Sequence, residues 1–229
     1  MVAQLVEKLS IYDEISRIIV TLNIPEKNHI SRNEKITLIE NSERKGFSAN
    51  NNAAFLHCKT QYFCVVNPDI ECLSNPFPQL VQSLDDPSVA VAAPLVTKGD
   101  GGIEVTARRF PSVASLAMKS IGRASEDYPL RIHDDILYPH WIAGMFMLFR
   151  TKDYRAVGGF DENFYLYYED VDICARLWES GRRVLICPSV FVVHNARRSS
   201  HRYWRYRLWH ARGLIRYFRY TRPNFLSGG

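Results

Sequence analysis

Apolar and polar residues follow one another along this chain in segments typical of strands and helices. Short β-branched and apolar runs predict strands, because a strand covered on both faces is apolar throughout. Apolar residues three and four apart, as at Leu5, Val6 and Leu9, predict amphipathic helices. The predicted strands are residues 18–22, 35–39, 62–66 and 89–96, and the predicted helices are residues 3–15, 46–58 and 76–84.

This order of elements predicts one α/β domain. Strands that alternate with helices favour a mostly parallel sheet covered by helices on both faces. The chain has 229 residues, 46% of them hydrophobic, which is enough for one substantial core. Ser48 or Asn50 is available to cap the helix at residues 46–58. Residues 108–139 show no regular period, which is typical of a lid or an acceptor-facing insertion.

The segment at residues 203–220 has two distinct sides when it is arranged as a helix. The apolar side holds Trp204, Leu208, Ala211, Ile215 and Phe218, and the adjoining basic side holds Arg205, Arg212, Arg216 and Arg219. This pattern fits a helix that docks on anionic lipid. It fits equally a helix packed on the domain with its arginines extended to water. We therefore divide the chain into a domain at residues 1–195 and a basic tail at residues 196–229.

The net charge of +5 conceals a strong asymmetry along the chain. Residues 180–229 hold eleven arginines and no acidic residue, and the other 179 residues carry a net charge of −6. Such a tail favours an anionic partner, whether phospholipid, pyrophosphate or nucleic acid. A nucleic-acid-binding module that uses these arginines and aromatic residues is one alternative. The acidic body and the carboxylate motifs argue against it, so no nucleic-acid partner is expected.

The composition also bears on where the protein works. No apolar run approaches the roughly 18 residues of a membrane span, and the first residues lack a signal-peptide pattern. The five cysteines include no Cys-x-x-Cys pair, so neither a disulfide framework nor a zinc site is predicted. We expect a protein of the reducing cytoplasm that is neither integral to the membrane nor secreted.

The first candidate site is Asn67-Pro68-Asp69, which follows the strand predicted at residues 62–66. A carboxylate there lies at the carboxyl edge of the sheet, where open α/β folds bind ligands. Pro68 restricts the turn. A divalent cation on a diphosphate takes one or two carboxylates from the protein, and Asp69 fits that role. An ordinary turn that binds nothing is the alternative interpretation.

The second candidate site is the acidic run Glu169, Asp170 and Asp172. The helical spacing that follows places these acids in the first turn of a helix, where the macrodipole stabilises them without any catalytic role. Tyrosines at positions 165, 167 and 168 bring apolar surface beside the acids, which would raise a carboxyl pKa toward the values of a general base. His194, at the end of an apolar run, is either a structural residue or a metal ligand.

Six blocks occur in one order along the chain: residues 40–54, 66–69, 141–144, 157–162, 168–172 and 188–194. Together they resemble the family 2 glycosyltransferases of GT-A fold, and within them the rhamnosyltransferases of bacterial surface-polysaccharide and O-antigen synthesis. The resemblance covers roughly residues 5–219. Several ordered blocks are far more specific than any single one.

The resemblance implies an inverting, metal-dependent sugar transfer. Asp69 matches the last residue of the family's DXD motif and would hold Mg²⁺ or Mn²⁺ against the donor diphosphate, and His194 would assist the metal or the phosphate. Asp170 would deprotonate the acceptor hydroxyl, with Glu169 in support. The residues matched to the donor-binding region are Asn41, Gly46, Phe47, Asn50, Asn51, Asn52, Asn67, Gly144 and Asp172.

The resemblance also implies partners and a location. The donor would be dTDP-rhamnose, and the acceptor a polyprenyl-diphosphate-linked saccharide at the inner face of the plasma membrane. The tail helix would bind that anionic surface. The family opens with a strand that touches the nucleotide base, whereas residues 18–22 match its second strand, so the first strand is expected to be missing. A truncated, inactive transferase is the alternative that this departure raises.

Overall fold

The computed structural model describes residues 1–25, 27, 29–31, 33–120, 127–131, 135–195 and 204–221. Its helices are α1 (Val2–Ser10), α2 (Phe47–Phe55), α3 (Phe77–Ser83), α4 (Val113–Ser120), α5 (Thr151–Ala156), α6 (Glu169–Glu179), α7 (Trp204–Arg216) and the π-helical turn η2 (Tyr217–Thr221). Its strands are β1 (Ile18–Leu22), β2 (Ile36–Glu40), β3 (Tyr62–Val66), β4 (Ile70–Glu71), β5 (Val89–Lys98), β6 (Ala107–Arg108), β7 (Trp141–Ile142), β8 (Phe146–Arg150) and β9 (Arg183–His194).

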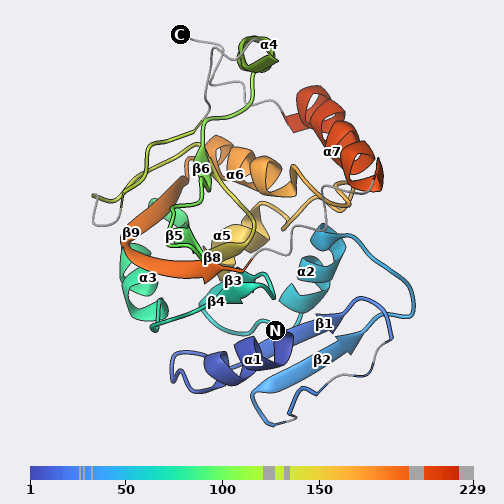
Figure 1. The fold of residues 1–229 in the computed structure, drawn as a ribbon, viewed down its shortest axis with the longest axis vertical. Helices are drawn as coiled ribbons and strands as arrows, with labels where there is room; N and C mark the ends of the chain where they lie inside the picture. Colours follow the sequence, from blue (N-terminus) through green and yellow to red (C-terminus); the bar gives the residue numbers. More distant parts are fainter. Residues whose placement is uncertain are drawn as a thin grey trace.

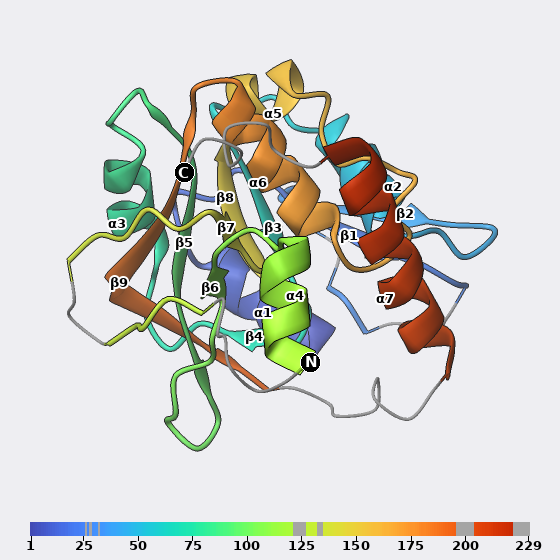
Figure 2. The same ribbon diagram turned by 90° about the horizontal axis from the view of Figure 1, so that it is seen from above.

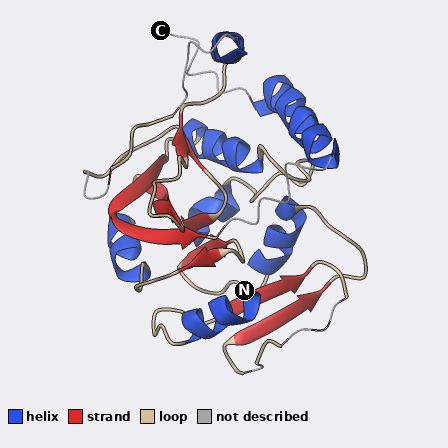
Figure 3. Cartoon of the chain, in the orientation of Figure 1, coloured by secondary structure: helices blue, strands red, loops and turns tan. Residues whose placement is uncertain are grey.

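A central sheet of five strands lies between layers of helices (Figures 1 and 3). The strand order is β3-β8-β5-β9-β4. Strands β3, β5 and β9 run in one direction, whereas β8 lies antiparallel between β3 and β5, and the short β4 lies antiparallel to β9. The predicted α/β architecture is confirmed. The sheet is mixed and not mostly parallel as predicted, because β8 and β4, two strands that the sequence did not predict, run antiparallel to their neighbours.

Strand β8 supplies side chains to both of the hydrophobic cores that flank the sheet. Phe146 and Leu148 belong to the core beneath α1 and α3, and Met147 and Phe149 belong to the core beneath α5 and α6. This division follows from the strand's period of two, which sends successive side chains to opposite faces. The prediction that helices cover both faces is therefore confirmed.

Strands β1 and β2 form a separate parallel pair beside α1, at the lower end of the molecule in Figure 1. Among the strands that the structure describes, β1 pairs only with β2, and β3 pairs only with β8. No described strand joins the two sheets by hydrogen bonds. The opening strand that the resemblance calls for is thus not found in the described part of the chain.

Several predicted boundaries and caps differ from the structure. Helix α1 ends at Ser10, and the chain continues in turns as the Tyr12 N–H donates to the Leu9 carbonyl at 3.2 Å. The capping prediction for α2 is wrong, because Gly46 is the N-cap residue and the Ser48 hydroxyl donates to the Phe164 carbonyl at 2.8 Å. The segment expected to be irregular contains α4 and part of β6.

The C-terminal helix α7 lies beside α6 in both views of the ribbon (Figures 1 and 2). Tyr217 is fully buried and Phe218 packs against the core, so the segment contacts the domain through this side. Phe218 was predicted on the same side of the helix as Trp204 and Ile215, but the π-helical turn η2 changes the helical phase there. Trp204 and Ile215 remain 69% and 67% exposed.

The boundary predicted at residue 196 lies outside the described residues. No described helix is long and apolar enough to cross a membrane.

Candidate active site

A turn at residues 143–145 holds the two carboxylate motifs at one edge of the sheet. The Asn67 N–H donates to the Met145 carbonyl at 2.8 Å, and the Gly144 N–H donates to Asp170 Oδ2 at 3.0 Å. The turn leads into β8, whose Phe146 lies opposite Val66 at the end of β3. The structure therefore brings together two motifs that lie about a hundred residues apart in the sequence.

Asp170 lies in the first turn of α6 and is partly open to solvent. Its Oδ1 accepts the Val171 N–H at 2.9 Å, and its Oδ2 accepts the Gly144 N–H. Burial raises the pKa of Asp170, although these backbone donors and the charge of Arg108 oppose the rise. The direction of this pKa shift is the one expected from the sequence.

Glu169 is buried, in contrast to Asp170. Only 5% of its surface is exposed, and its Oε2 has no hydrogen-bond partner among the described residues. Burial raises the pKa of Glu169 well above its ordinary range, and the adjacent Asp170 carboxylate raises it further. Glu169 is therefore enclosed within the first turn of α6, whereas the adjacent Asp170 stays partly open to solvent.

Asp172 points away from Asp170, toward the C-terminal segment. Its Oδ2 accepts two hydrogen bonds from Arg176, at 2.8 and 2.5 Å, and its Oδ1 accepts the Thr221 hydroxyl at 2.5 Å. Both oxygens are engaged and the residue is 3% exposed. The structure gives Asp172 a supporting position and does not bring it to the donor-binding residues.

Asp69 and His194 lie together at the ends of β3 and β9. Asp69 Oδ2 is 3.3 Å from His194 Nε2, and His194 Nδ1 is 2.7 Å from Glu104 Oε2. Ile70 lies opposite His194 in the pairing of β4 with β9, so the sheet itself sets this contact. The sequence analysis selected Asp69 and His194 separately, and the structure shows them as one cluster.

This cluster fits a divalent cation that is shared with a substrate. Asp69 Oδ1 is buried and has no hydrogen-bond partner among the described residues. Two ligands on one octahedral ion with bonds of about 2.1 Å lie roughly 3 Å apart, close to the observed 3.3 Å between Asp69 Oδ2 and His194 Nε2. In the described residues, no group of three or more His, Cys, Asp or Glu side chains suits a metal ion by itself. Phosphate oxygens would have to complete the coordination.

Three asparagines form a network at the ends of β1 and β2. Asn41 Nδ2 donates to Asn50 Oδ1 at 2.8 Å and to Asn23 Oδ1 at 3.0 Å. Asn23 also accepts the Lys45 N–H at 2.9 Å and donates to the Lys45 carbonyl at the same distance. Asn41 is 6% exposed. The network thus fixes the loop that leads into α2, and it brings Asn41 and Asn50 together as the resemblance implies.

Gly46 allows the backbone at the start of α2 to pack closely on the loop that contains Tyr165. A Cβ atom on Gly46 would lie 2.6 Å from the Tyr165 carbonyl oxygen, so this position is closed to a side chain by the protein itself. The adjacent Phe47 N–H donates to that same oxygen at 2.8 Å. At Gly144 a Cβ would meet the Phe47 ring and Asp170 at 3.5 Å. Gly46, Phe47 and Gly144 therefore join α2 to the loop before Asp170.

The other two asparagines of α2 are occupied within the protein. Asn52 Nδ2 donates to the Phe160 carbonyl at 2.8 Å and to Glu162 at 3.0 Å, and its Oδ1 accepts from the Tyr154 hydroxyl at 2.7 Å. Asn51 Nδ2 donates to the Phe47 carbonyl at 2.9 Å. These contacts give Asn52 a structural role, and the side-chain partners of Asn51 and Asn52 do not include Asp69 or Asp170.

A family model described as Glycosyl transferase family 2 matches residues 21–154, which is more than half of the chain. The chain belongs to this family. A second model, described as the N-terminal domain of galactosyltransferase, matches residues 132–216 and so includes the helix that carries Asp170. The two matches together span both carboxylate motifs of this family 2 glycosyltransferase.

Curated relatives of this glycosyltransferase include bacterial rhamnosyltransferases. The rhamnosyltransferase WbbL of Escherichia coli is 26% identical over 194 residues, covering 80% of this chain and 72% of WbbL. The N-acetylglucosaminyl-diphospho-decaprenol L-rhamnosyltransferase of Mycobacterium tuberculosis is 28% identical over 147 residues, covering 60% of this chain and 48% of the relative. The chain thus spans about half the length of the mycobacterial enzyme.

Solved structures confirm the GT-A fold of the glycosyltransferase. The mannosyltransferase PcManGT of Pyrobaculum calidifontis, in complex with GDP-Man and Mn²⁺, superposes with a TM-score of 0.62 at 16% identity and covers 95% of this chain and 61% of that one. GalNAc-T7 with UDP, GalNAc and Mn²⁺ superposes with a TM-score of 0.60 at 14% identity over 80% of this chain and 38% of its own. Likeness at this level of identity shows the fold alone.

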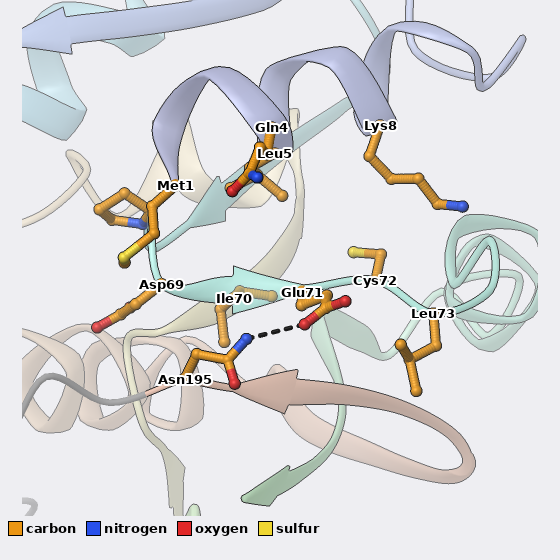
Figure 4. Close-up of a pocket in the computed structure, with 11 residues that line it drawn as sticks. Met1, Gln4, Leu5, Lys8, Asp69, Ile70, Glu71, Cys72, Leu73 and Asn195 are labelled. Carbon is orange, nitrogen blue, oxygen red and sulfur yellow. Dashed lines mark hydrogen bonds between the residues drawn. The ribbon is translucent and has the colours of Figure 1, made fainter. Parts of the chain in front are cut away.

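A cavity of about 500 Å³ adjoins the candidate metal ligand of the glycosyltransferase. Figure 4 shows that helix α1 covers it on one side and β4 lies on the other, with Asp69 near one end and Lys8 near the other. Asn195 Nδ2 donates to Glu71 Oε2 at 2.8 Å across the lower wall. Charged and polar groups therefore reach this hollow from both of its walls.

The sequence analysis missed two residues of the glycosyltransferase site. Glu104 lies 90 positions from His194, and no local spacing links the two. Asn23 directly follows the strand predicted at residues 18–22, and polar residues just beyond an apolar strand were also the signal that selected Asn67 and Asp69. Only the tertiary structure shows that Glu104 lies beside His194, whereas Asn23 could have been predicted from the sequence.

Proposed function

We propose that this glycosyltransferase moves a sugar from a nucleotide-sugar donor to an acceptor hydroxyl with inversion of configuration, using Asp170 as the general base. One observation carries the proposal. Asp170 alone among the acids of its motif stays partly open to solvent, while Glu169 and Asp172 are buried. The raised pKa of Asp170 and its two fixed backbone hydrogen bonds suit a base that must accept a proton in a defined direction.

The proposed transfer is a single displacement at the anomeric carbon of the donor. Asp170 takes the proton of the acceptor hydroxyl while that oxygen attacks the anomeric carbon of the donor. The bond from this carbon to the diphosphate oxygen breaks, and the nucleoside diphosphate leaves with the bonding electron pair. The proton then passes from Asp170 to solvent. Attack on the face opposite the leaving group inverts the anomeric configuration.

Asp69 and His194 are the residues proposed to hold Mg²⁺ or Mn²⁺ at the donor diphosphate. A bound divalent cation would stabilise the negative charge that develops on the leaving diphosphate. The unpartnered Oδ1 of Asp69 and the 3.3 Å spacing of Oδ2 from His194 Nε2 support this role. Both solved neighbours contain Mn²⁺ together with a nucleotide or nucleotide sugar.

The proposed donor is dTDP-rhamnose, and the proposed acceptor is a polyprenyl-diphosphate-linked saccharide in surface-polysaccharide or O-antigen synthesis. Two relatives are rhamnosyltransferases, and the name of one contains a decaprenol-linked diphospho-sugar. Such an acceptor resides at the inner face of the plasma membrane. The protein would then be cytoplasmic and peripheral to that membrane.

Helix α7 is the proposed contact with the anionic lipid surface. Trp204, Leu208 and Ile215 are exposed apolar residues on its outer side, and Arg205 and Arg212 beside them are exposed too. Apolar residues that enter the interface and arginines that meet lipid phosphates are the features of an interfacial helix. The side of α7 that packs on the domain is a different one, so docking requires no rearrangement of the core.

The test is metal-dependent transfer or donor hydrolysis, measured over a panel of nucleotide sugars that begins with dTDP-rhamnose. Asp170→Asn should lower kcat by about 100-fold or more while nucleotide binding persists. Asp69→Ala should lower affinity for the donor in the presence of metal. Asp100→Asn, at an exposed loop tip, is the matched control and should behave as wild type. Full activity of both site variants would contradict the assignment.

Two other outcomes of the same experiment would point to different functions. Donor binding by calorimetry without transfer to any acceptor would identify an inactive transferase. Salt-sensitive RNA binding without affinity for nucleotide sugars would favour the nucleic-acid-binding module. The acidic body of the chain and the ordered carboxylate site favour the enzyme.

A further inference from the structure

The residues directly before Asp170 adopt an unusual backbone conformation. Tyr167 and Tyr168 have φ angles of 72° and 71°, so two consecutive non-glycine residues lie in the left-handed region. Such residues are uncommon, and they persist only where the surrounding structure holds them. Tyr168 is also the N-cap residue of α6. The direction in which α6 starts, and with it the position of Asp170, therefore depends on what holds this turn.

Helix α7 packs directly on the strained turn. A Cβ atom on Gly213 would lie 2.8 Å from the Tyr167 carbonyl oxygen and 3.0 Å from the Tyr168 ring. The His210 ring is 5.1 Å from the Tyr168 ring, and the fully buried Tyr217 ring is 5.9 Å from it. Gly213 thus lets the helix backbone reach the turn at a distance that no other residue would permit.

Two polar contacts fix the same segment on either side of the turn. Before it, Arg216 donates two hydrogen bonds to Asp161 Oδ2, at 2.9 and 2.6 Å. After it, the Thr221 hydroxyl donates to Asp172 Oδ1 at 2.5 Å, inside the first turn of α6. Asp170 lies between these two attachment points in the sequence. Figures 1 and 2 show α7 running beside α6 from both directions.

We propose that α7 and η2 form a positioning element that holds the Tyr167–Tyr168 turn in its left-handed conformation and thereby fixes Asp170 for proton transfer. Gly213 and Thr221 are the positioning residues, and they act through the turn and through Asp172 without touching substrate. The proposal rests on the proposed function of Asp170 as the base. A displacement of about 1 Å at a reacting group is enough to lower a rate strongly.

Gly213→Ala separates this role from helix stability. Alanine is the better helix former, so the substitution favours α7 itself while its methyl group displaces the turn. We expect kcat to fall about tenfold or more, with donor KM and nucleotide affinity within about twofold of wild type. Gly99→Ala is the matched control, because a Cβ there meets only Asn195 Oδ1 at 3.5 Å.

Thr221 provides the conservative comparison. Thr221→Val removes the hydroxyl that binds Asp172 and should lower kcat in the same way, whereas Thr221→Ser keeps the hydroxyl and should retain the wild-type kcat. Equal kcat values for Thr221→Val and wild type, or wild-type kcat for Gly213→Ala, would overturn the proposal.

Backbone amide hydrogen exchange tests the element without any assay of transfer. Gly213→Ala should speed exchange in residues 165–172, and Gly99→Ala should not. If wild-type protein transfers no sugar from any donor, the proposed function fails, and the exchange comparison still decides whether α7 holds the turn. Unchanged exchange at residues 165–172 in Gly213→Ala would overturn the positioning role whatever the transfer assay shows.

Discussion

Glu169 and Asp170 are adjacent acids whose surroundings give them different roles. Asp170 is oriented by backbone N–H groups and stays partly open, whereas Glu169 is enclosed with an unpartnered oxygen among the described residues. Burial raises the pKa of both. A buried acid next to the proposed base lowers the free energy of unfolding at neutral pH, as is common at catalytic sites.

The Glu169→Gln variant tests this cost. Folding raises the pKa of Glu169, so the folded protein binds this proton more tightly than the unfolded chain does. The free energy of unfolding therefore falls as pH rises from the pKa of Glu169 in the unfolded chain to its higher pKa in the folded protein. The variant should therefore be more stable than wild type by about 1 kcal/mol or more at pH 7 to 8. The difference should vanish below about pH 4. Thermal melts followed by circular dichroism measure it.

Glu179→Gln is the control, since Glu179 is the exposed acid at the other end of α6. It should leave the melting temperature unchanged within about 1 °C across the same pH range. A Glu169→Gln variant that melts below wild type at neutral pH would show that the Glu169 carboxylate is stabilising and would refute this account.

Glu104 is expected to orient His194 toward the metal. Its carboxylate lies 2.7 Å from His194 Nδ1, which leaves Nε2 directed at Asp69. A carboxylate behind a ligating histidine contributes about 10- to 100-fold in metal affinity. Glu104→Ala should weaken Mn²⁺ binding by that factor in electron paramagnetic resonance titrations with nucleotide present. Glu43→Ala, at an exposed loop position, should not change it, and equal affinities for all three proteins would exclude the role.

At the scale of elements, α7 has two sides with different surroundings. Its inner side contacts the turn before α6, and its outer side carries exposed apolar residues next to arginines. The sequence left open whether this helix docks on lipid or packs on the domain. The structure shows the packing side, and lipid docking stays a prediction for the other side.

Ile215→Glu tests lipid docking. Ile215 is 67% exposed on the outer side of α7, so a glutamate there should leave the fold intact and lower binding to phosphatidylglycerol vesicles by about tenfold or more. Ile11→Glu is the matched control, because Ile11 is 66% exposed next to α1. Vesicle cosedimentation at low and high salt measures the effect. Equal binding of both variants would indicate that α7 is not the contact surface.

At the scale of the whole molecule, the donor is expected to connect two sheets that share a hydrophobic core but that no described strand pairing joins. The asparagine network belongs to the β1–β2 pair and α2, while Asp69 and His194 belong to the five-stranded sheet. Among the described strands, no hydrogen bonds join these two sheets. A nucleotide that reaches both would stabilise their mutual arrangement.

Thermal stability with ligands tests this expectation. A nucleotide-sugar donor with Mn²⁺ at about 100 times its Kd should stabilise the protein by about 2.7 kcal/mol. Removal of the metal with EDTA should abolish most of this gain and all sugar transfer. Asp69→Ala should lose the metal-dependent part, and Asp100→Asn should keep it. A donor-induced shift that is the same with and without metal would contradict the proposed role of Asp69.

The sequence predicted those elements whose signal is local. Strands β1 and β3 and helix α6 match their predicted positions, because their apolar runs and their terminal turn residues lie within a few positions of one another. Strand β8 was missed, because the apolar run that forms it was treated only as a neighbour of the motif at residues 141–144. Phe218 was misplaced because the π-helical turn η2 alters the helical period that the prediction assumed.

By itself, the sequence determined the α/β class, the family, the acidic motifs and the two-sided tail, because each depends on residues a few positions apart or on blocks that occur in a fixed order. Only the tertiary structure decided that Asp170 stays partly open while Glu169 is buried, that Glu104 lies behind His194, and that Gly213 packs against the Tyr167–Tyr168 turn. These relations join residues that lie on different elements or on opposite sides of one helix turn. The burial of such residues and the distances between them depend on how the elements pack, and a local sequence pattern contains no information about that packing.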